Sequence, residues 1–211
     1  MTKEIPDNCP YTVEKGEQPH FIEYCSGYSL PNVVCNKCRK FFKNYWKDRY
    51  GTEWKAGTSR VKHALKVLKK NFPNLSIEPT KYAVSEEYIP PSDIHEKHEP
   101  NIIIAKGKSI ICDIEVTGSD IGMEPPNDIF ILKGKFLTAQ KRKREESIET
   151  WFYTIYRNSE YVLDLHLIEK FDSEKAEEKY LKGVPEWYIE IPCADAYPKE
   201  KLFEWLKKKI S

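Results

Sequence analysis

The segment that most constrains the fold of this chain is EPNIIIAKGKSIICDIEVTG, which covers residues 99–118. It contains two β-rich runs, Asn101–Ala105 and Ser109–Thr117, separated by the turn sequence KGK. Short runs of β-branched residues around a turn with glycine are typical of a β-hairpin. The sequence therefore predicts two paired antiparallel strands at this point.

The second run of this hairpin has two chemically different faces, because side chains alternate across a strand. The apolar face carries Ile110, Cys112, Ile114 and Val116, and the polar face carries Ser109, Ile111, Asp113, Glu115 and Thr117. If helices cover the sheet, adjacent carboxylates are costly to bury as anions unless they are paired or bind a metal. Oxygen ligands of this kind suit Mg²⁺ or Mn²⁺, which would neutralise a phosphodiester and activate water. The alternative is an edge strand whose polar face meets solvent.

Hydrophobic periodicity predicts an α/β order of elements around the hairpin. A helix is expected from a cap at Thr58 or Ser59 to Phe72, where Pro73 would end it. The further expected elements are strands at Leu75–Val84, Thr150–Tyr156, Tyr161–Ile168 and Trp187–Ile191, and helices at Ile129–Arg144 and Lys199–Ile210. These elements predict a mixed sheet flanked by helices.

The hairpin sequence resembles the core of the PD-(D/E)XK nuclease superfamily. In that superfamily an acid follows a proline on one strand, and a Glu-x-Lys pair ends the next strand. By this resemblance Asn101, after Pro100, stands at the position of the first acid. Glu115 stands at the metal-binding acid and Thr117 at the lysine. The resemblance covers about residues 58–168 and implies a restriction-endonuclease-like core.

Two of the three core positions depart from the family's pattern. In the family the acids hold a divalent metal, and the lysine helps to position or activate the attacking water. Asn101 still offers a carbonyl oxygen, whereas Thr117 carries no charge. Asp113, on the same face as Glu115, is a candidate for the missing carboxylate. Lys133 or Lys135, in the following helix, is a candidate for the missing cation.

Residues 1–55 differ in composition from residues 56–211, and we interpret them as a small separate module attached to the α/β domain. The module contains Cys9, Cys25, Cys35 and Cys38. The two-residue gap between Cys35 and Cys38 lets both sulfurs meet one Zn²⁺ ion, with His20 competing as a ligand. Free thiols in a reducing compartment are the other interpretation, and an iron–sulfur cluster ranks behind both. Bound zinc would order a segment too small to fold by its own core.

Charge and hydropathy narrow the expected location and partners. The chain has 34 Lys+Arg against 33 Asp+Glu, so net charge alone indicates no partner. Basic residues nevertheless cluster at Lys37–Arg49, Arg60–Lys70 and Lys133–Arg144, either to face phosphates or as solvated faces of helices. The chain begins without an apolar leader, and no apolar run approaches the length of a membrane span. We therefore expect a cytoplasmic protein, or a nuclear one in a eukaryote.

These observations lead to one functional hypothesis and two alternatives. The first is a metal-dependent endonuclease of restriction or repair type that hydrolyses phosphodiester bonds of DNA, with Asn101, Asp113 and Glu115 around Mg²⁺ or Mn²⁺. A homodimer would let such an enzyme cut both strands. The second is a non-catalytic nucleic-acid- or protein-binding module on the same fold, because a decayed nuclease would lose its acid and its lysine. The third is an α+β interaction protein with exposed hairpin carboxylates.

Overall fold

The structure is a computed structural model. It describes residues 55–81, 83–84, 99–118, 124–179 and 186–211, without the side chains of 172–186. The predicted amino-terminal module, with Cys9, Cys25, Cys35 and Cys38, lies outside the described residues. Among the described residues, no helix is long and apolar enough to cross a membrane.

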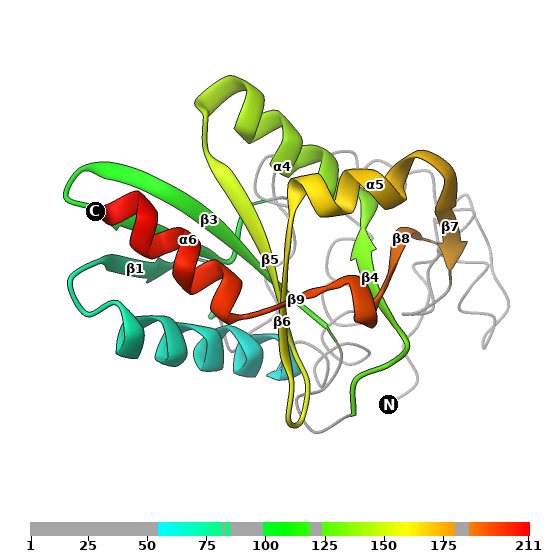
Figure 1. The fold of residues 1–211 in the computed structure, drawn as a ribbon, viewed down its shortest axis with the longest axis horizontal. Helices are drawn as coiled ribbons and strands as arrows, with labels where there is room; N and C mark the ends of the chain where they lie inside the picture. The colour runs from blue at the N-terminus through cyan, green and yellow to red at the C-terminus, as the bar shows by residue number, and fades with distance from the viewer. Residues whose placement is uncertain (1–54, 82, 85–98, 119–123, 180–185) are drawn as a thin grey trace, which may run out of the picture.

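The larger of the two sheets has six strands among the described residues, in the order β1-β2-β3-β5-β6-β9 (Figure 1). The strands are β1 (Ser76–Pro79), β2 (Ile102–Lys106), β3 (Ser109–Thr117), β5 (Glu149–Ile155), β6 (Glu160–Asp164) and β9 (Tyr197–Pro198). β3 and β5 are parallel, and the other neighbouring pairs are antiparallel. A parallel pair needs a long crossover, and the chain between β3 and β5 contains helix α4 (Lys133–Glu146).

The predicted hairpin is confirmed as β2 and β3. Its turn contains Gly107 with a φ of 62°, in the left-handed region that glycine adopts without steric cost. Ile102 lies opposite Ile114, and the register shifts by a bulge between Ile104 and Ala105. β3 pairs with β2 on one side and β5 on the other, so it is an interior strand of the sheet.

Two predicted elements are wrong in part. Residues 129–132, expected in a helix, form strand β4 (Asp128–Leu132), which pairs with β8 (Glu186–Pro192). β8 also pairs with β7 (Ala176–Lys179), and together they make a three-stranded sheet. Residues 165–168, expected in a strand, begin helix α5 (Leu165–Lys175). The backbone N–H of Leu167 donates to Asp164 Oδ1 at 2.7 Å, so Asp164 caps this helix.

Two smaller boundaries also differ from expectation. The strand expected over Leu75–Val84 ends at Pro79, and a turn follows in which Ala83 N donates to Thr80 O at 3.1 Å. The predicted cap at Thr58 or Ser59 is wrong, because helix already covers residues 55–71. Ser59 Oγ instead donates to Lys55 O at 2.9 Å within that helix.

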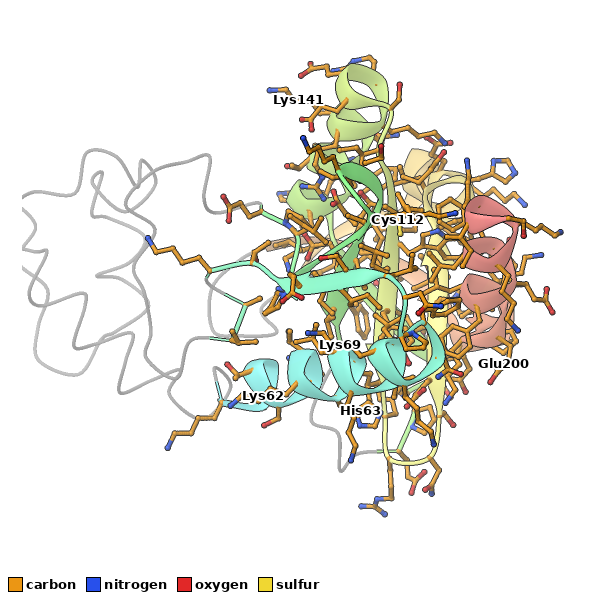
Figure 2. All side chains as sticks on the ribbon, turned by 90° about the vertical axis from the view of Figure 1, so that its left-hand side faces the viewer. Lys62, His63, Lys69, Cys112, Lys141 and Glu200 are labelled. Atoms are coloured by element: carbon orange, nitrogen blue, oxygen red, sulfur yellow. The ribbon has the colours of Figure 1, made fainter. Side chains whose placement is uncertain are left out.

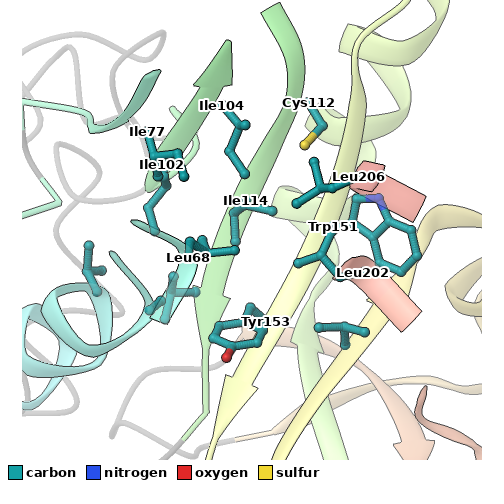
Figure 3. Close-up of a cluster of buried hydrophobic side chains, with 14 of the residues drawn as sticks. Leu68, Ile77, Ile102, Ile104, Cys112, Ile114, Trp151, Tyr153, Leu202 and Leu206 are labelled. Atoms are coloured by element: carbon teal, nitrogen blue, oxygen red, sulfur yellow. The ribbon is translucent and has the colours of Figure 1, made fainter. Parts of the chain in front are cut away.

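Helices and the smaller sheet cover both faces of the larger sheet (Figure 1). On one face, the 55–71 helix and α6 (Glu200–Ile210) enclose a core that includes Leu68, Ile77, Ile102, Ile104, Cys112, Ile114, Trp151, Tyr153, Leu202 and Leu206 (Figure 3). On the other face, α4, α5 and the smaller sheet enclose a second core that includes Ile129, Phe136, Phe152, Leu163, Ile168 and Ile189. The predicted class, a mixed sheet flanked by helices, is confirmed.

Candidate active site

The two carboxylates of β3 are buried. Asp113 is 2% exposed and Glu115 is 0% exposed, although both lie on the polar face of the strand. The alternating residues Cys112, Ile114 and Val116 belong to the core on the opposite face. The expectation of an edge strand with solvent-exposed carboxylates is therefore wrong, because β3 lies inside the sheet and α4 covers its polar face.

α4 places two cations on these buried carboxylates. Lys135 Nζ donates to Glu115 Oε2 at 2.8 Å, and Arg142 Nε lies 2.7 Å from Asp113 Oδ2. Seven residues are about two helical turns, so Lys135 and Arg142 lie on the same face of α4. The helix crosses β3 in the opposite direction to the strand, and each cation therefore meets one acid. Pairing of this kind offsets the cost of burying the anions.

The burial of Asp113 changes its protonation. Burial raises the pKa of Asp113 to about 6, against the lowering effect of the Arg142 guanidinium, and the Glu115 carboxylate raises it further. Arg142 Nε and Asp113 Oδ2 lie at ion-pair distance without hydrogen-bond alignment. Arg142 also donates from its terminal nitrogen to Thr150 Oγ1 at 3.4 Å. Asp113 is thus engaged by a neighbouring side chain and is easier to protonate than an exposed aspartate.

Glu115 retains one unused acceptor. Its Oε1 atom is buried and has no hydrogen-bond partner among the described residues, while Oε2 accepts from Lys135. A buried acceptor without a partner costs free energy, and such atoms are uncommon in folded proteins. An added electrophile, such as a cation, would satisfy this oxygen.

Asn101 immediately precedes β2 and lies beside Glu115 of β3. Its backbone N–H donates to Ile114 O at 3.0 Å, and its Oδ1 accepts from Val116 N at 2.7 Å. The side chain therefore ties β2 to β3 at the level of Glu115, and its carbonyl oxygen keeps a second lone pair. Thr117 ends β3 and is half-buried.

Of the two candidate lysines, the structure brings Lys135 to Glu115. Lys133 begins α4 two residues earlier, about 200° around the helix, so it faces a different direction. Sequence reasoning missed Arg142. Its spacing of seven residues from Lys135 was a usable signal, since a buried acid at Asp113 requires its own partner on the same helix face.

Carboxylate and amide oxygens are the ligand types that a hard divalent cation prefers. Mg²⁺ binds through one or two carboxylates and keeps several waters for contact with phosphate, rather than using a full protein cage. Glu115 Oε1 and the amide oxygen of Asn101 would supply protein ligands, and Asp113 lies two residues from Glu115 on the same face. Within the described residues, no group of three or more His, Cys, Asp or Glu side chains gathers around one point.

A second polar cluster, also missed from sequence, lies at the β5–β6 turn. Glu160 Oε1 contacts His63 Nε2 at 2.6 Å, and Glu160 Oε2 accepts from Tyr153 at 2.8 Å and from Lys199 at 2.5 Å. Burial opposes ionisation of Glu160, but hydrogen bonds from Lys199, His63 and Tyr153 outweigh it and hold its pKa below the usual value. His63, Glu160 and Lys199 line a pocket of about 440 Å³.

Comparison with known proteins gives similarity in fold. No protein-family model matches the sequence, and no curated protein matches it. The Holliday junction resolvase Hjc of Archaeoglobus fulgidus is 13% identical with a TM-score of 0.43, over 69% of this chain and 98% of that chain. A nuclease from a fusselovirus is also 13% identical with a TM-score of 0.43, over 82% of this chain and 94% of that chain. Both likenesses concern the arrangement of helices and strands.

Proposed function

We propose that this chain is a divalent-metal-dependent nuclease that hydrolyses phosphodiester bonds of DNA. The observation that carries the proposal is the contact of Lys135 Nζ with Glu115 Oε2 at 2.8 Å, beside Glu115 Oε1, which no described residue hydrogen-bonds. The family's motif has a lysine two residues after the metal-binding acid, and this sequence has Thr117 at that position. In this proposal the lysine comes from α4 instead of from β3.

Each residue has a separate role in this reaction. Glu115 Oε1, with the amide oxygen of Asn101, would hold Mg²⁺ or Mn²⁺. The bound ion would stabilise charge on the phosphodiester and lower the pKa of a bound water. Lys135 would donate a hydrogen bond to the attacking water or to a non-bridging phosphoryl oxygen, as a positive charge that Glu115 holds in place. Asp113 is a further oxygen ligand in its ionised form.

A non-catalytic nucleic-acid- or protein-binding module is the second candidate. It is favoured by the pairing of both carboxylates, since Lys135 and Arg142 already neutralise Glu115 and Asp113 without a metal. A decayed nuclease would keep the fold and these ion pairs after losing the affinity for the ion. The two candidate functions differ in whether a divalent cation binds the protein and supports cleavage of DNA.

Cleavage of single- and double-stranded DNA with Mg²⁺ or Mn²⁺ tests the proposal. The wild type is compared with Glu115→Gln, Lys135→Met and the matched control Lys133→Met, which removes a lysine from another face of α4. We expect Glu115→Gln and Lys135→Met each to reduce kcat by about 100-fold or more, and Lys133→Met to change it little. Full activity of Lys135→Met would contradict the role given to Lys135.

Metal binding provides a readout that does not depend on activity. If Glu115 holds the ion, Mn²⁺ should raise the melting temperature of the wild type and leave that of Glu115→Gln unchanged. DNA binding without cleavage, together with no effect of either metal on melting, would establish the binding module instead.

A further inference from the structure

Five exposed lysines from two distant parts of the sequence meet at one end of the larger sheet, and we call this surface the lysine end. They are Lys106, Lys108, Lys207, Lys208 and Lys209. The first two flank the turn of the β2–β3 hairpin, and the other three form the last turn of α6. Lys106 Nζ donates to Ile210 O at 2.6 Å, which fixes the hairpin against the helix end. Figure 1 shows the hairpin and the carboxyl terminus together, and Figure 2 views the molecule from that side.

The charge of the lysine end is not balanced locally. None of its five lysines forms an ion pair with an acidic side chain in the part of the chain that the structure describes. On α4, by contrast, Lys141 and Arg144 pair with Glu145, and Lys143 pairs with Glu149. The whole chain has a formal net charge of +1, so a general excess of basic residues does not explain the positive charge at this end.

Helix stabilisation explains this charge only in part. Lysines in the last turn of a helix interact favourably with the helix dipole, which accounts for some of Lys207, Lys208 and Lys209. It does not account for Lys106 and Lys108, which belong to a hairpin about a hundred residues earlier in the sequence. Like charges that are brought together repel one another, and a bound polyanion would relieve that repulsion.

The position of the lysine end separates it from the candidate active site. Glu115 lies six residues after Ser109 along β3, which is roughly 20 Å at about 3.3 Å per residue. α6 also packs on the opposite face of the sheet from α4. A small ligand bound at this end would therefore not contact the oxygens of Glu115.

We propose that the lysine end is a second binding surface for nucleic acid. It contacts the phosphate backbone and does not recognise the base sequence. The choice of a nucleic acid among polyanions rests on the proposed function. Lysine ammonium groups suit this task because they act as mobile point charges on phosphates and release condensed counterions. The contact adds affinity for long nucleic acid and takes no part in hydrolysis.

The test is the salt dependence of binding to a fluorescent duplex DNA, measured in a Glu115→Gln background so that the DNA stays intact. Affinity falls as salt concentration rises, and each phosphate contact contributes about 0.9 to the magnitude of the slope of log affinity against log salt concentration. We expect the magnitude of that slope to decrease by about 2 to 3 in a triple variant that combines Lys207→Gln, Lys208→Gln and Lys209→Gln. Adding Lys106→Gln and Lys108→Gln should lower it further.

A triple variant with the same loss of charge is the matched control. Lys55→Gln, Lys66→Gln and Lys170→Gln remove three exposed lysines that lie apart on the 55–71 helix and α5. An equal decrease of the slope in both triple variants would overturn the proposal, because net charge alone would then explain it. Binding of the protein to vesicles rich in phosphatidylserine, with none to duplex DNA, would overturn it as well.

Cleavage kinetics separate this proposal from the proposed function. With Glu115 intact and DNA at saturating concentration, the Lys207, Lys208 and Lys209 triple variant should retain kcat and show a raised KM on long duplexes. A protein that never cleaves, but whose binding slope depends on the lysine end, would contradict the nuclease and support this surface. A fall in kcat with unchanged KM would contradict the proposed separation of the two regions.

Discussion

At the scale of single residues, the candidate site depends on how two buried acids are satisfied. Glu115 accepts a hydrogen bond from Lys135 through Oε2, and its Oε1 has no hydrogen-bond partner in the described part of the chain. Asp113 meets Arg142 and has its pKa raised to about 6 by burial. The two acids are therefore not equivalent, and Glu115 Oε1 is the oxygen that we expect to bind a cation.

Replacing Lys135 should lower the stability of the fold as well as the rate of the proposed reaction. Lys135→Met leaves the fully buried Glu115 carboxylate without its cation, and the loss of one partner of a buried pair costs about 3 kcal/mol. Urea unfolding measures this loss. Lys141→Met, which breaks an exposed pair on the same helix, should cost at most about 0.5 kcal/mol. The double variant Glu115→Gln with Lys135→Met should recover part of the lost stability, and no recovery would contradict the pairing.

Asp113 should produce a specific dependence of stability on pH. Its pKa is raised from 3.8 to about 6 in the folded protein, so between these values the folded state binds more protons than the unfolded state. The free energy of unfolding therefore falls as pH rises through this window, by about 3 kcal/mol at most. Urea unfolding of the wild type and Asp113→Asn, at several pH values across the window, isolates this contribution. Identical pH slopes in the two proteins would refute the assignment.

The sequence predicted part of this site for a physical reason. Alternation along β3 places Asp113 and Glu115 on one face, and that inference needs only the geometry of a strand. The choice between Lys133 and Lys135 stayed open because it depends on where α4 begins. α4 begins at Lys133, after β4, and that boundary is set by the pairing of β4 with β8 about 60 residues later in the sequence. Local periodicity does not contain this information.

At the scale of elements, Glu160 joins four parts of the chain. His63 comes from the 55–71 helix, Tyr153 from β5 and Lys199 from the start of α6, and all three contact this carboxylate of β6. The contacts connect the two helices on one face of the sheet to the β5–β6 hairpin. The cluster therefore fixes how these elements pack.

Glu160→Gln should weaken this packing, by about 2 kcal/mol near neutral pH, because hydrogen bonds to a charged group are lost. The pKa of Glu160 is lowered in the folded protein, so its contribution is present above the unfolded pKa and disappears as pH falls through the folded pKa. Urea unfolding near neutral pH and in acid measures both effects. Glu204→Gln, an exposed change on α6, is the control, and an equal loss in both variants would contradict this role for Glu160.

The elements that sequence reasoning identified are those with local signals. The hairpin has a glycine turn and alternating side chains, and α6 has an amphipathic pattern, so both were predicted to within a residue or so. β7 and β9 were missed, because four-residue and two-residue strands are defined by their partners and not by their own composition. The whole of α5 was missed, although its cap, Asp164, is a residue type typical of helix starts.

At the scale of the whole molecule, the candidate active site and the lysine end lie at different places along β3. The strand starts at the lysine end, where the hairpin meets α6, and carries Glu115 near its other end under α4. A rigid interior strand holds the two regions at a fixed separation. A nucleic acid bound at both would need to follow the outside of the sheet, so long substrates should benefit from the lysine end more than short ones.

We predict that residues 1–55 form a module separate from the domain of residues 56–211. Removal of zinc should then unfold the module and leave the domain folded. In the part of the chain that the structure describes, the buried residues of both cores lie between Val61 and Leu206. We therefore expect the domain to stay folded without the module. We expect the intact chain to contain one Zn²⁺ held by Cys9, Cys25, Cys35 and Cys38. Chelation should then expose the module to trypsin while a fragment from about residue 56 to the carboxyl terminus persists, identified by mass spectrometry. Cys35→Ser with Cys38→Ser should give the same fragment without a chelator. Loss of protection throughout residues 56–211 would show instead that the domain needs the module to fold.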